Sequence, residues 1–277
     1  MREAESAPLT PLVTIEDCAQ GSRWIGIGNQ WTRDLYDGPF HIPADAETAG
    51  VRTPLVSLVF VQSRDGNTGA DNPGDLGAGP VDQHLIYEGL SRVAADAVMA
   101  GGKTAEGEEV FFSVWHPQLV SLRAELGLAR HPAQIVVSGS GCVDLERCLV
   151  FNVPDVPVFI LASPGGCARL ERAASRRPHI ELVPLPGTDL RPGLEYLERD
   201  RGIRRISAIG GRTTASALID EGLVQDLTLT TSARSGGEPH TPFYVGKTPP
   251  SLNPIVRKRG TDVEYPIVVE QMALTND

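Results

Sequence analysis

Four segments of this chain combine glycine with hydroxyl or basic side chains directly after short apolar runs. They are residues 101–104, 138–141, 163–166 and 210–214, and they include the cations Lys103 and Arg212. Glycine lets a ligand approach the backbone closely, and a helix that begins after such a turn presents free N–H groups. Small residues with N–H, hydroxyl and cationic donors therefore predict an extended phosphorylated ligand such as a dinucleotide.

The fourth segment carries this pattern most fully. An apolar run ends at Ile209, a glycine pair follows, and an amphipathic helix then extends to Gly222. One alternative stays open, because a glycine pair before a helix is often only a tight turn, and strand-to-helix turns are rich in glycine in general. The predicted phosphate-binding residues are Gly101, Gly102, Lys103, Thr104, Ser138, Gly139, Ser140, Gly210, Gly211, Arg212, Thr213 and Thr214.

Two familiar nucleotide motifs do not fit. A phosphate-binding loop of the Walker type needs a glycine five residues before Gly102, where Ala97 stands, and acidic residues at 106–109 follow where the helix should begin. The glycine-rich turn of a dinucleotide-binding βαβ unit is also missing, since residues 63–68 hold a single glycine. The ligand must be bound in another way.

Two charged residues could act on a substrate. Asp65 follows the first strong apolar run, where a carboxylate could orient a substrate or relay a proton, although an Asp-Gly turn explains it equally well. Arg92 could anchor an anionic substrate, and a salt bridge on a helix face explains it at least as well. The arginines at 169, 172, 176 and 177 are predicted to form a solvated helix face.

Composition excludes several classes of protein. The chain has 277 residues, 41% of them hydrophobic, and a formal charge of −10, which argues against a nucleic-acid or anionic-membrane surface. Neither its four cysteines nor its six histidines show metal-ligand spacing, so no metal site is expected. No apolar run is long enough to span a bilayer, and residues 1–11 lack the layout of a signal peptide. A cytoplasmic protein is the expectation.

The elements that must position these residues alternate between strand and helix. Apolar runs predict strands at 55–61, 96–100, 134–137, 158–161, 180–183 and 206–209, with helices between them. This order predicts right-handed crossovers and a largely parallel sheet, whose carboxyl-terminal strand ends bring the four segments to one edge. Residues 223–231 read as a half-exposed or edge strand and 263–273 as a last strand, both able to pair antiparallel. Residues 1–52 are predicted to be an arm with aromatic anchors, and 53–277 one α/β domain.

These pieces, in this order, resemble the reductase domain of the bifunctional riboflavin-biosynthesis deaminase–reductases. The similarity covers about residues 53–273 and rests on short motifs whose order and spacing make it specific. They are Ser63-Arg64-Asp65-Gly66, Arg92 with Asp96-Ala97-Val98, Gly101 to Thr104, Ser138 after a strand, Gly210-Gly211 before a helix, and Leu223-Val224-Gln225-Asp226-Leu227.

The resemblance implies a dihydrofolate reductase-like, three-layer α/β/α fold with a mixed, mostly parallel sheet, NADPH as cofactor, and a homodimer. It implies that Lys103 and Thr104 meet cofactor phosphates, that Ser138 to Ser140 lie near the adenosine 2′-phosphate, and that Gly210 to Thr214 hold the pyrophosphate. Ser63 and Asp65 are then the candidate catalytic residues, and Gly66, Arg92 and Ile209 the candidate substrate-binding residues. The zinc signature of the deaminase is absent, which predicts a stand-alone reductase.

One position departs from the family pattern. The family has Glu-Gly-Gly where this chain has Ile209-Gly210-Gly211, and isoleucine cannot accept a hydrogen bond from a polar substrate. We therefore expect hydride transfer to a C=N, C=O or conjugated C=C group of a small molecule other than the riboflavin-pathway intermediate. The alternatives are a riboflavin-pathway pyrimidine reductase, a pterin reductase, or a nucleotide-binding protein without catalysis.

Overall fold

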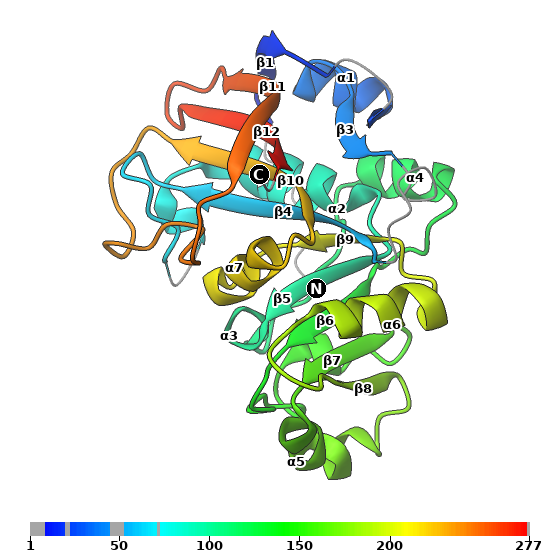
Figure 1. The fold of residues 1–277 in the computed structure, drawn as a ribbon. Helices are drawn as coiled ribbons and strands as arrows, with labels where there is room; N and C mark the ends of the chain where they lie inside the picture. The colour runs from blue at the N-terminus through cyan, green and yellow to red at the C-terminus, as the bar shows by residue number, and fades with distance from the viewer. Residues whose placement is uncertain (1–8, 20–22, 45–52, 71–72, 276–277) are drawn as a thin grey trace.

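The computed structural model describes residues 9–19, 23–44, 53–70 and 73–275, and its centre is a ten-stranded sheet (Figure 1). The strand order is β1-β11-β12-β10-β4-β9-β5-β6-β7-β8, and a separate hairpin pairs β2 with β3. All neighbours from β10 to β8 are parallel, whereas β10-β12, β12-β11 and β11-β1 are antiparallel. The predicted α/β class with a mixed, mostly parallel sheet is confirmed.

The described strands follow the predicted apolar runs and add four that were not predicted, namely β1, β2, β3 and β11. The strands are β1 (Leu12–Asp17), β2 (Trp24–Ile27), β3 (Phe40–Pro43), β4 (Leu55–Gln62), β5 (Ala97–Gly101), β6 (Ala133–Val137), β7 (Val158–Ala162), β8 (Ile180–Pro184), β9 (Arg205–Ala208), β10 (Val224–Ser232), β11 (Ser251–Gly260) and β12 (Ile267–Thr275).

Apart from α1, which lies between the antiparallel strands β2 and β3, the described helices fill the crossovers between parallel strands. The helix predicted between the strands at 55–61 and 96–100 is a π-helix that continues into a short α-helix. The helices are α1 (Gln30–Tyr36), η2 (Pro73–Leu76), η3 (Val81–Leu90), α2 (Ser91–Val93), α3 (Gly102–Ala105), α4 (Pro117–Glu125), η4 (Leu149–Phe151), α5 (Pro164–Ala174), α6 (Arg191–Arg201) and α7 (Arg212–Asp220).

Helices cover both faces of the sheet, which explains why strand β4 is apolar almost throughout. Leu58 and Phe60 pack in the core cluster that contains residues of α6 and α7, on the face turned to the viewer in Figure 1. Val61 packs with η3 and α4 in a second cluster, and Val59 packs with residues of α5 in a third. The cores therefore hold the strand ends, and the loops that follow them, in fixed relative positions.

Strand β10 was predicted to be half-exposed or at an edge, and this is wrong. It lies between β4 and β12, and most of its residues are buried. The alternation of Leu227 and Leu229 with Thr228 and Thr230 reads as one polar face, but both threonines are buried against neighbouring elements. Alternation alone could not show that covering elements lie on both sides.

The first part of the chain adds to the main sheet. Strand β1 pairs with β11 at the sheet edge, Tyr36 and Phe40 are buried in the core with η3, and Trp31 stacks on His116 with ring centroids 4.1 Å apart. The side chains of Trp31, Tyr36 and Phe40 thus attach this segment to the rest of the domain. The predicted boundary at residue 52 falls outside the described residues.

A buried carboxyl in β10 gives a first prediction. Asp226 is 1% exposed and accepts a 2.6 Å hydrogen bond from Oγ of Ser57. Burial raises its pKa from 3.8 to about 7, against the opposing effects of Ser57 and Arg205. Because the folded protein then binds the proton more tightly than the unfolded chain, the free energy of unfolding falls as pH rises from about 4 to 7.

We expect Asp226→Asn to remove that loss. In thermal unfolding, the melting temperature of the variant minus that of the natural protein should increase as the pH is raised from 5 to 8. Asp155→Asn, at an exposed position, is the matched control and should show no such pH-dependent difference. A parallel pH dependence for Asp226→Asn and the natural protein would contradict the assignment of the proton to Asp226.

Candidate active site

The loops after β9, β5, β6 and β7 touch one another along the carboxyl edge of the sheet. The amide of Gly101 donates to the carbonyl of Gly210 over 3.1 Å, and the amide of Ser163 donates to the carbonyl of Gly139 over 3.1 Å. Between these two pairs, a Cβ built on Gly102 would lie 3.4 Å from Oγ of Ser138. The structure therefore brings the four predicted segments, 101–104, 138–141, 163–166 and 210–214, together in one continuous row of loops.

The turn after β9 has the shape expected of a phosphate cradle. Gly210 and Gly211 have φ angles of +134° and +65°, which disfavour any side chain. A Cβ on Gly211 would lie 3.5 Å from Cα of Gly101, so two loop backbones approach each other here. Helix α7 begins directly after, and no side chain caps it. Its first N–H groups and the positive end of its dipole suit an anion.

Helix α5, which follows β7, is different. Oγ of Ser163 accepts a hydrogen bond from the amide of Gly166 over 3.1 Å and so caps the helix. A Cβ on Gly166 would lie 2.7 Å from the carbonyl oxygen of Gly139. Glycine is needed at 166 for packing against the neighbouring loop. The loop at 163–166 therefore supports the row of loops more than it offers donors to a ligand.

The polar side chains of the row face solvent. Lys103, Ser140 and Thr213 are exposed, and Thr104, Ser138 and Arg212 are half-buried, whereas Thr214 is buried behind them. In the part of the chain that the structure describes, no carboxylate forms an ion pair with Lys103 or Arg212. These cations are available to an anionic ligand despite the overall negative charge.

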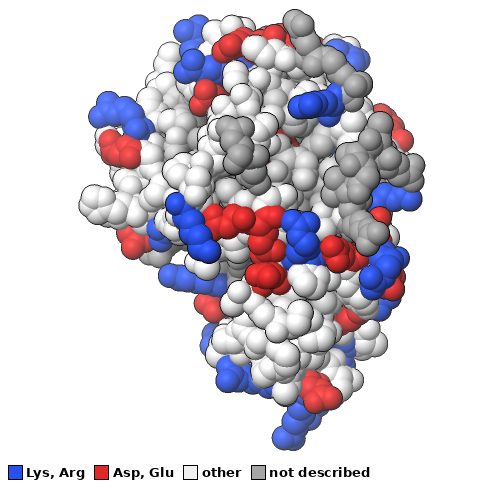
Figure 2. Space-filling view, viewed as in Figure 1, with Lys and Arg blue, Asp and Glu red and all other residues white. Residues whose placement is uncertain are grey.

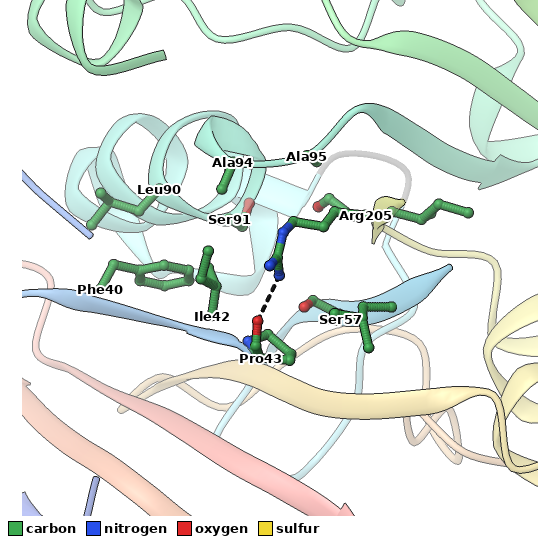
Figure 3. A pocket seen from close by; sticks show the side chains of 12 residues that line it. Phe40, Ile42, Pro43, Ser57, Leu90, Ser91, Ala94, Ala95 and Arg205 are labelled. Atoms are coloured by element: carbon green, nitrogen blue, oxygen red, sulfur yellow. Dashed lines mark hydrogen bonds between the residues drawn. The ribbon is translucent and has the colours of Figure 1, made fainter. Parts of the chain in front are cut away.

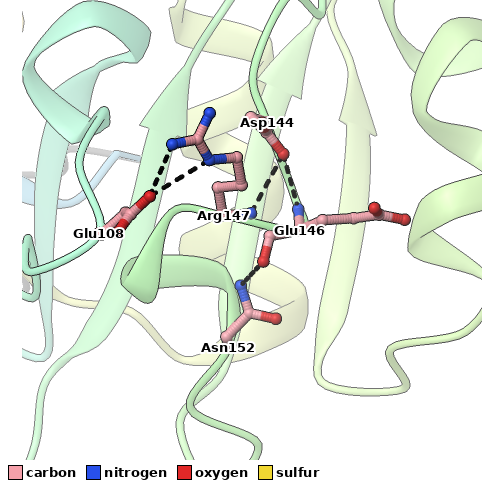
Figure 4. A network of polar contacts seen from close by, with 5 residues as sticks. All are labelled: Glu108, Asp144, Glu146, Arg147 and Asn152. Atoms are coloured by element: carbon pink, nitrogen blue, oxygen red, sulfur yellow. Dashed lines mark hydrogen bonds and ion pairs between the residues drawn. The ribbon is translucent and has the colours of Figure 1, made fainter.

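A polar network joins the segments that follow two of these loops (Figure 4). Arg147 pairs with Glu108 over 2.7 Å, and the carboxylate of Asp144 accepts from the amides of Glu146 and Arg147. Asn152 closes the turn by donating to the carbonyl of Glu146. The ion pair is largely exposed and contributes little energy, but it links the chain after β5 to the chain after β6.

The tip of β4 lies at the same edge, on the side of β10. Oγ of Ser63 is fully buried and has no hydrogen-bond partner among the described residues. Asp65 is exposed and accepts hydrogen bonds of 3.2 Å from Oγ of Ser235 and from the amide of Gly236, while Gly66 turns the chain at φ +80°. Asp65 thus ties its loop to the one after β10. The unpartnered Ser63 hydroxyl is a polar group that a ligand or water would satisfy.

Arg92 and Ile209 are not brought to an open surface. Arg92 is 2% exposed, lies against the rings of Tyr87 and Phe112, and donates to the carbonyl of Ser113 over 3.2 Å. Ile209 is 3% exposed and packs in the core, where its carbonyl accepts from the Tyr87 hydroxyl over 3.3 Å. The structure places both residues behind the site, connected through Tyr87, instead of in its wall.

A buried acid near this edge was missed by the sequence reasoning. Asp82, in the π-helix η3, is 6% exposed, and burial raises its pKa to about 7 although the Thr230 hydroxyl opposes the shift. Thr230 pairs with Val61 near the carboxyl ends of β10 and β4. A carboxyl that keeps its proton near neutral pH is a candidate proton donor, and π-helices are frequent at functional sites. The sequence did offer one signal for it, namely the Asp82 carboxylate on the apolar face of the helix at 81–90.

A pocket lies at the opposite edge of the sheet, between helix α2, strand β3 and the first residues of β4 and β9 (Figure 3). It is small, with a cavity volume of about 20 Å³. Arg205 crosses it and donates to the carbonyl of Pro43 over 2.6 Å. Ligands of open α/β sheets bind at the carboxyl strand ends, so we assign the chemistry to the row of loops and not to this pocket.

The charges on the face shown in Figure 2 are mixed in sign. Positive and negative side chains are interspersed over the face shown in Figure 2, without a continuous basic area. Among the described residues, no group of His, Cys, Asp or Glu is arranged to hold a metal ion. None of the described helices is both long and apolar enough to cross a membrane.

Comparison with known proteins identifies the fold. The family model described as the RibD C-terminal domain matches residues 54–260. RibD from Acinetobacter baumannii superposes with a TM-score of 0.64 at 16% identity, covering 83% of this chain, and this chain spans 60% of its length. No curated protein matches.

Two other similar structures match over nearly their whole length. One is a pyrimidine reductase-like protein from Corynebacterium diphtheriae, with a TM-score of 0.60 at 20% identity, covering 81% of this chain and 93% of that one. The other is the riboflavin biosynthesis reductase Rib7 of Saccharomyces cerevisiae, with a TM-score of 0.56 at 16% identity, covering 82% and 95%.

Proposed function

This chain belongs to the RibD C-terminal domain family, and we propose that it is an NADPH-dependent oxidoreductase that reduces a C=N, C=O or conjugated C=C group of a small molecule. The predicted resemblance to the riboflavin-biosynthesis reductases is confirmed by the family match. One observation supports the cofactor above all, namely the uncapped start of α7 beside the paired backbones of Gly211 and Gly101.

The residues of the row fit the parts of NADPH. The amides at the start of α7, with Arg212 and Thr213, would hold the pyrophosphate, because free N–H groups and a cation stabilise its charge. Lys103 and Thr104 stand on the adjoining loop after β5. The loop at Ser138, Gly139 and Ser140 would receive the adenosine end. When bound, NADPH supplies the hydride.

The remaining groups would bind and protonate the substrate at the tips of β4 and β10. When the carbon of a C=N or C=O group receives the hydride, the nitrogen or oxygen of that group is left in need of a proton. Asp82 can hold such a proton at neutral pH because burial raises its pKa to about 7. Asp65 and Ser63 stay candidates for orienting the substrate, and Gly66 allows close approach.

The proposed substrate class rests on the residue type at position 209. Ile209 is apolar and buried, so this position offers no carboxylate to a polar substrate. A site that lacks such a partner leaves a buried polar group unpaired, at about 1–3 kcal/mol for each lost bond. We therefore propose a less polar imine, enone or carbonyl as substrate. The riboflavin-pathway pyrimidine agrees equally well with the family match, and a pterin is a further alternative.

The experiment is a titration with NADPH followed by an oxidation screen. Purified protein should change the cofactor fluorescence on binding, and NADPH oxidation should then be followed with pyrimidine, pterin, quinone, enone and imine compounds. We expect turnover on a conjugated carbonyl or imine and weak turnover on the phosphoribosylamino-pyrimidinedione. Efficient turnover of that compound would favour the pathway reductase. Binding without any oxidation would favour a non-catalytic nucleotide-binding protein.

The remaining assignments are proposals from the family resemblance. We infer a homodimer in the cytoplasm that acts on a small molecule and contacts neither nucleic acid nor a membrane. Equilibrium sedimentation tests the dimer directly.

A further inference from the structure

One arginine on the exposed face of helix α5 is held in place by hydrogen bonds to the neighbouring loop. Arg169 lies in the second turn of the helix, and its Nη1 donates to the carbonyl of Ser140 over 2.8 Å and to Sγ of Cys142 over 2.8 Å. Arg172, one turn further along, makes no side-chain hydrogen bond or ion pair within the described ranges. Arg169 is therefore held over the loop after β6, although the guanidinium is exposed.

Arg169 keeps N–H donors that its described neighbours do not use. Both bonds use one nitrogen and go to a carbonyl oxygen and a thiol sulfur, while Nε and Nη2 have no partner in the part of the chain that is described. No described carboxylate pairs with it. A fixed guanidinium with two free N–H directions is suited to a phosphate group, which it can contact in a bidentate manner.

The place of Arg169 in the row decides which phosphate this is. The start of α7 lies at the end of β9, and the neighbouring loop lies at the end of β5. Arg169 lies further along the same edge, where β6 and β7 end. Neighbouring strands are about 4.8 Å apart, so Arg169 is about 10–14 Å along the edge from the proposed pyrophosphate site. A dinucleotide laid along this edge has only one phosphate at its far, adenosine end, and that is the 2′-phosphate of NADPH.

We propose that Arg169 recognises the 2′-phosphate and sets the preference for NADPH over NADH. This inference rests on the proposed function, because it needs the dinucleotide to lie along the carboxyl edge. The hydroxyls of Ser138 and Ser140 stand beside the same loop and add neutral donors. Lys103, nearer to β5, contributes to phosphates that both cofactors share.

Binding measurements separate this role from a structural one. Dissociation constants for NADPH and NADH should be measured by fluorescence with the natural protein, Arg169→Gln, Arg169→Lys and the control Arg172→Gln. We expect Arg169→Gln to weaken NADPH binding about tenfold or more and NADH binding less than threefold, as for loss of a charge-assisted contact. Arg169→Lys should recover part of the affinity, and Arg172→Gln should resemble the natural protein. Lys103→Ala should weaken both cofactors alike.

An independent readout comes from Cys142, whose thiol touches Arg169. NADPH bound at this loop should slow alkylation of Cys142 by iodoacetamide, measured by peptide mass spectrometry, with exposed Cys18 as the internal reference. NADH should protect less than NADPH in the natural protein, and the difference should disappear in Arg169→Gln.

The outcomes distinguish two failures. If the natural protein binds neither dinucleotide, the proposed function falls together with this inference. If it binds NADPH but Arg169→Gln loses both cofactors equally, or loses neither, Arg169 only supports the loop or plays no part, and the inference alone is overturned.

Discussion

Gly139→Val is expected to weaken NADPH binding at least tenfold and to leave the fold unchanged. A Cβ on Gly139 meets no atom within 4 Å, and the residue has no positive φ, so the protein itself accommodates a side chain there. The loop nevertheless lies between the loops after β5 and β7 in the proposed cofactor row. The valine branches would occupy space that the adenosine end needs, and a tenfold loss corresponds to about 1.4 kcal/mol.

The matched control for this prediction is Gly187→Val. Gly187 is also exposed, without positive φ and without neighbours within 4 Å of a built Cβ, but it follows β8, the last strand of the sheet. Both variants should melt within about 2 °C of the natural protein, as surface substitutions do. Normal NADPH affinity in Gly139→Val would contradict the assignment of the cofactor site to this row of loops. The glycine pair at 210–211 is a poorer test, because positive φ at both residues would combine folding and binding effects.

Asp82→Asn is expected to reduce turnover about 10²-fold, the lower end of what a positioned proton donor contributes. The groups that face Asp82 are Glu88 of the same π-helix, whose negative charge raises the pKa further, and Thr230 of β10, which lowers it. Because the carboxyl loses its proton around pH 7, turnover of the natural enzyme should fall as pH rises through that value. The residual activity of Asp82→Asn should not show this fall.

Asp65→Asn is the comparison that separates the two acids. Its carboxylate is exposed and already accepts hydrogen bonds from Ser235 and Gly236, so an amide retains one acceptor and should lower turnover without shifting the pH profile. Both variants should be assayed on the substrate found by the oxidation screen, with NADPH affinity measured in parallel. Unchanged turnover in Asp82→Asn, or loss of the pH dependence in Asp65→Asn, would indicate that Asp65 is the proton donor instead of Asp82.

The parallel part of the sheet and the row of loops were predictable from the sequence. Runs such as 55–61 and 158–161 are continuous and apolar because both faces of these strands are covered, and each is followed by a turn with glycine or serine. Strands that alternate with helices must run parallel, so their carboxyl ends meet at one edge whatever the details of packing. The positions of Lys103, Gly139 and Gly210 at that edge follow from this rule alone.

The strands outside this alternation could not be predicted. Strand β11 contains Pro254 and three consecutive basic residues at 257–259, and β1 stands in a polar segment, so neither shows a clear period. They form because each pairs with a neighbour distant in sequence, β1 with β11 and β11 with β12. Such pairing depends on tertiary context more than on local preference.

The roles of individual side chains were also decided by tertiary structure. In the sequence, Arg92 and Arg169 cannot be told apart, because both are arginines in predicted helices. Packing nevertheless buries Arg92 against two aromatic rings and places Arg169 over the loop after β6. An aspartate reads alike at 65 and at 82, yet only Asp82 is enclosed so that its pKa rises to about 7. The sequence determines which strand ends share an edge, because period and order act locally. Which side chains at that edge are buried, charged or free depends on contacts between distant residues, and only the folded chain supplies these.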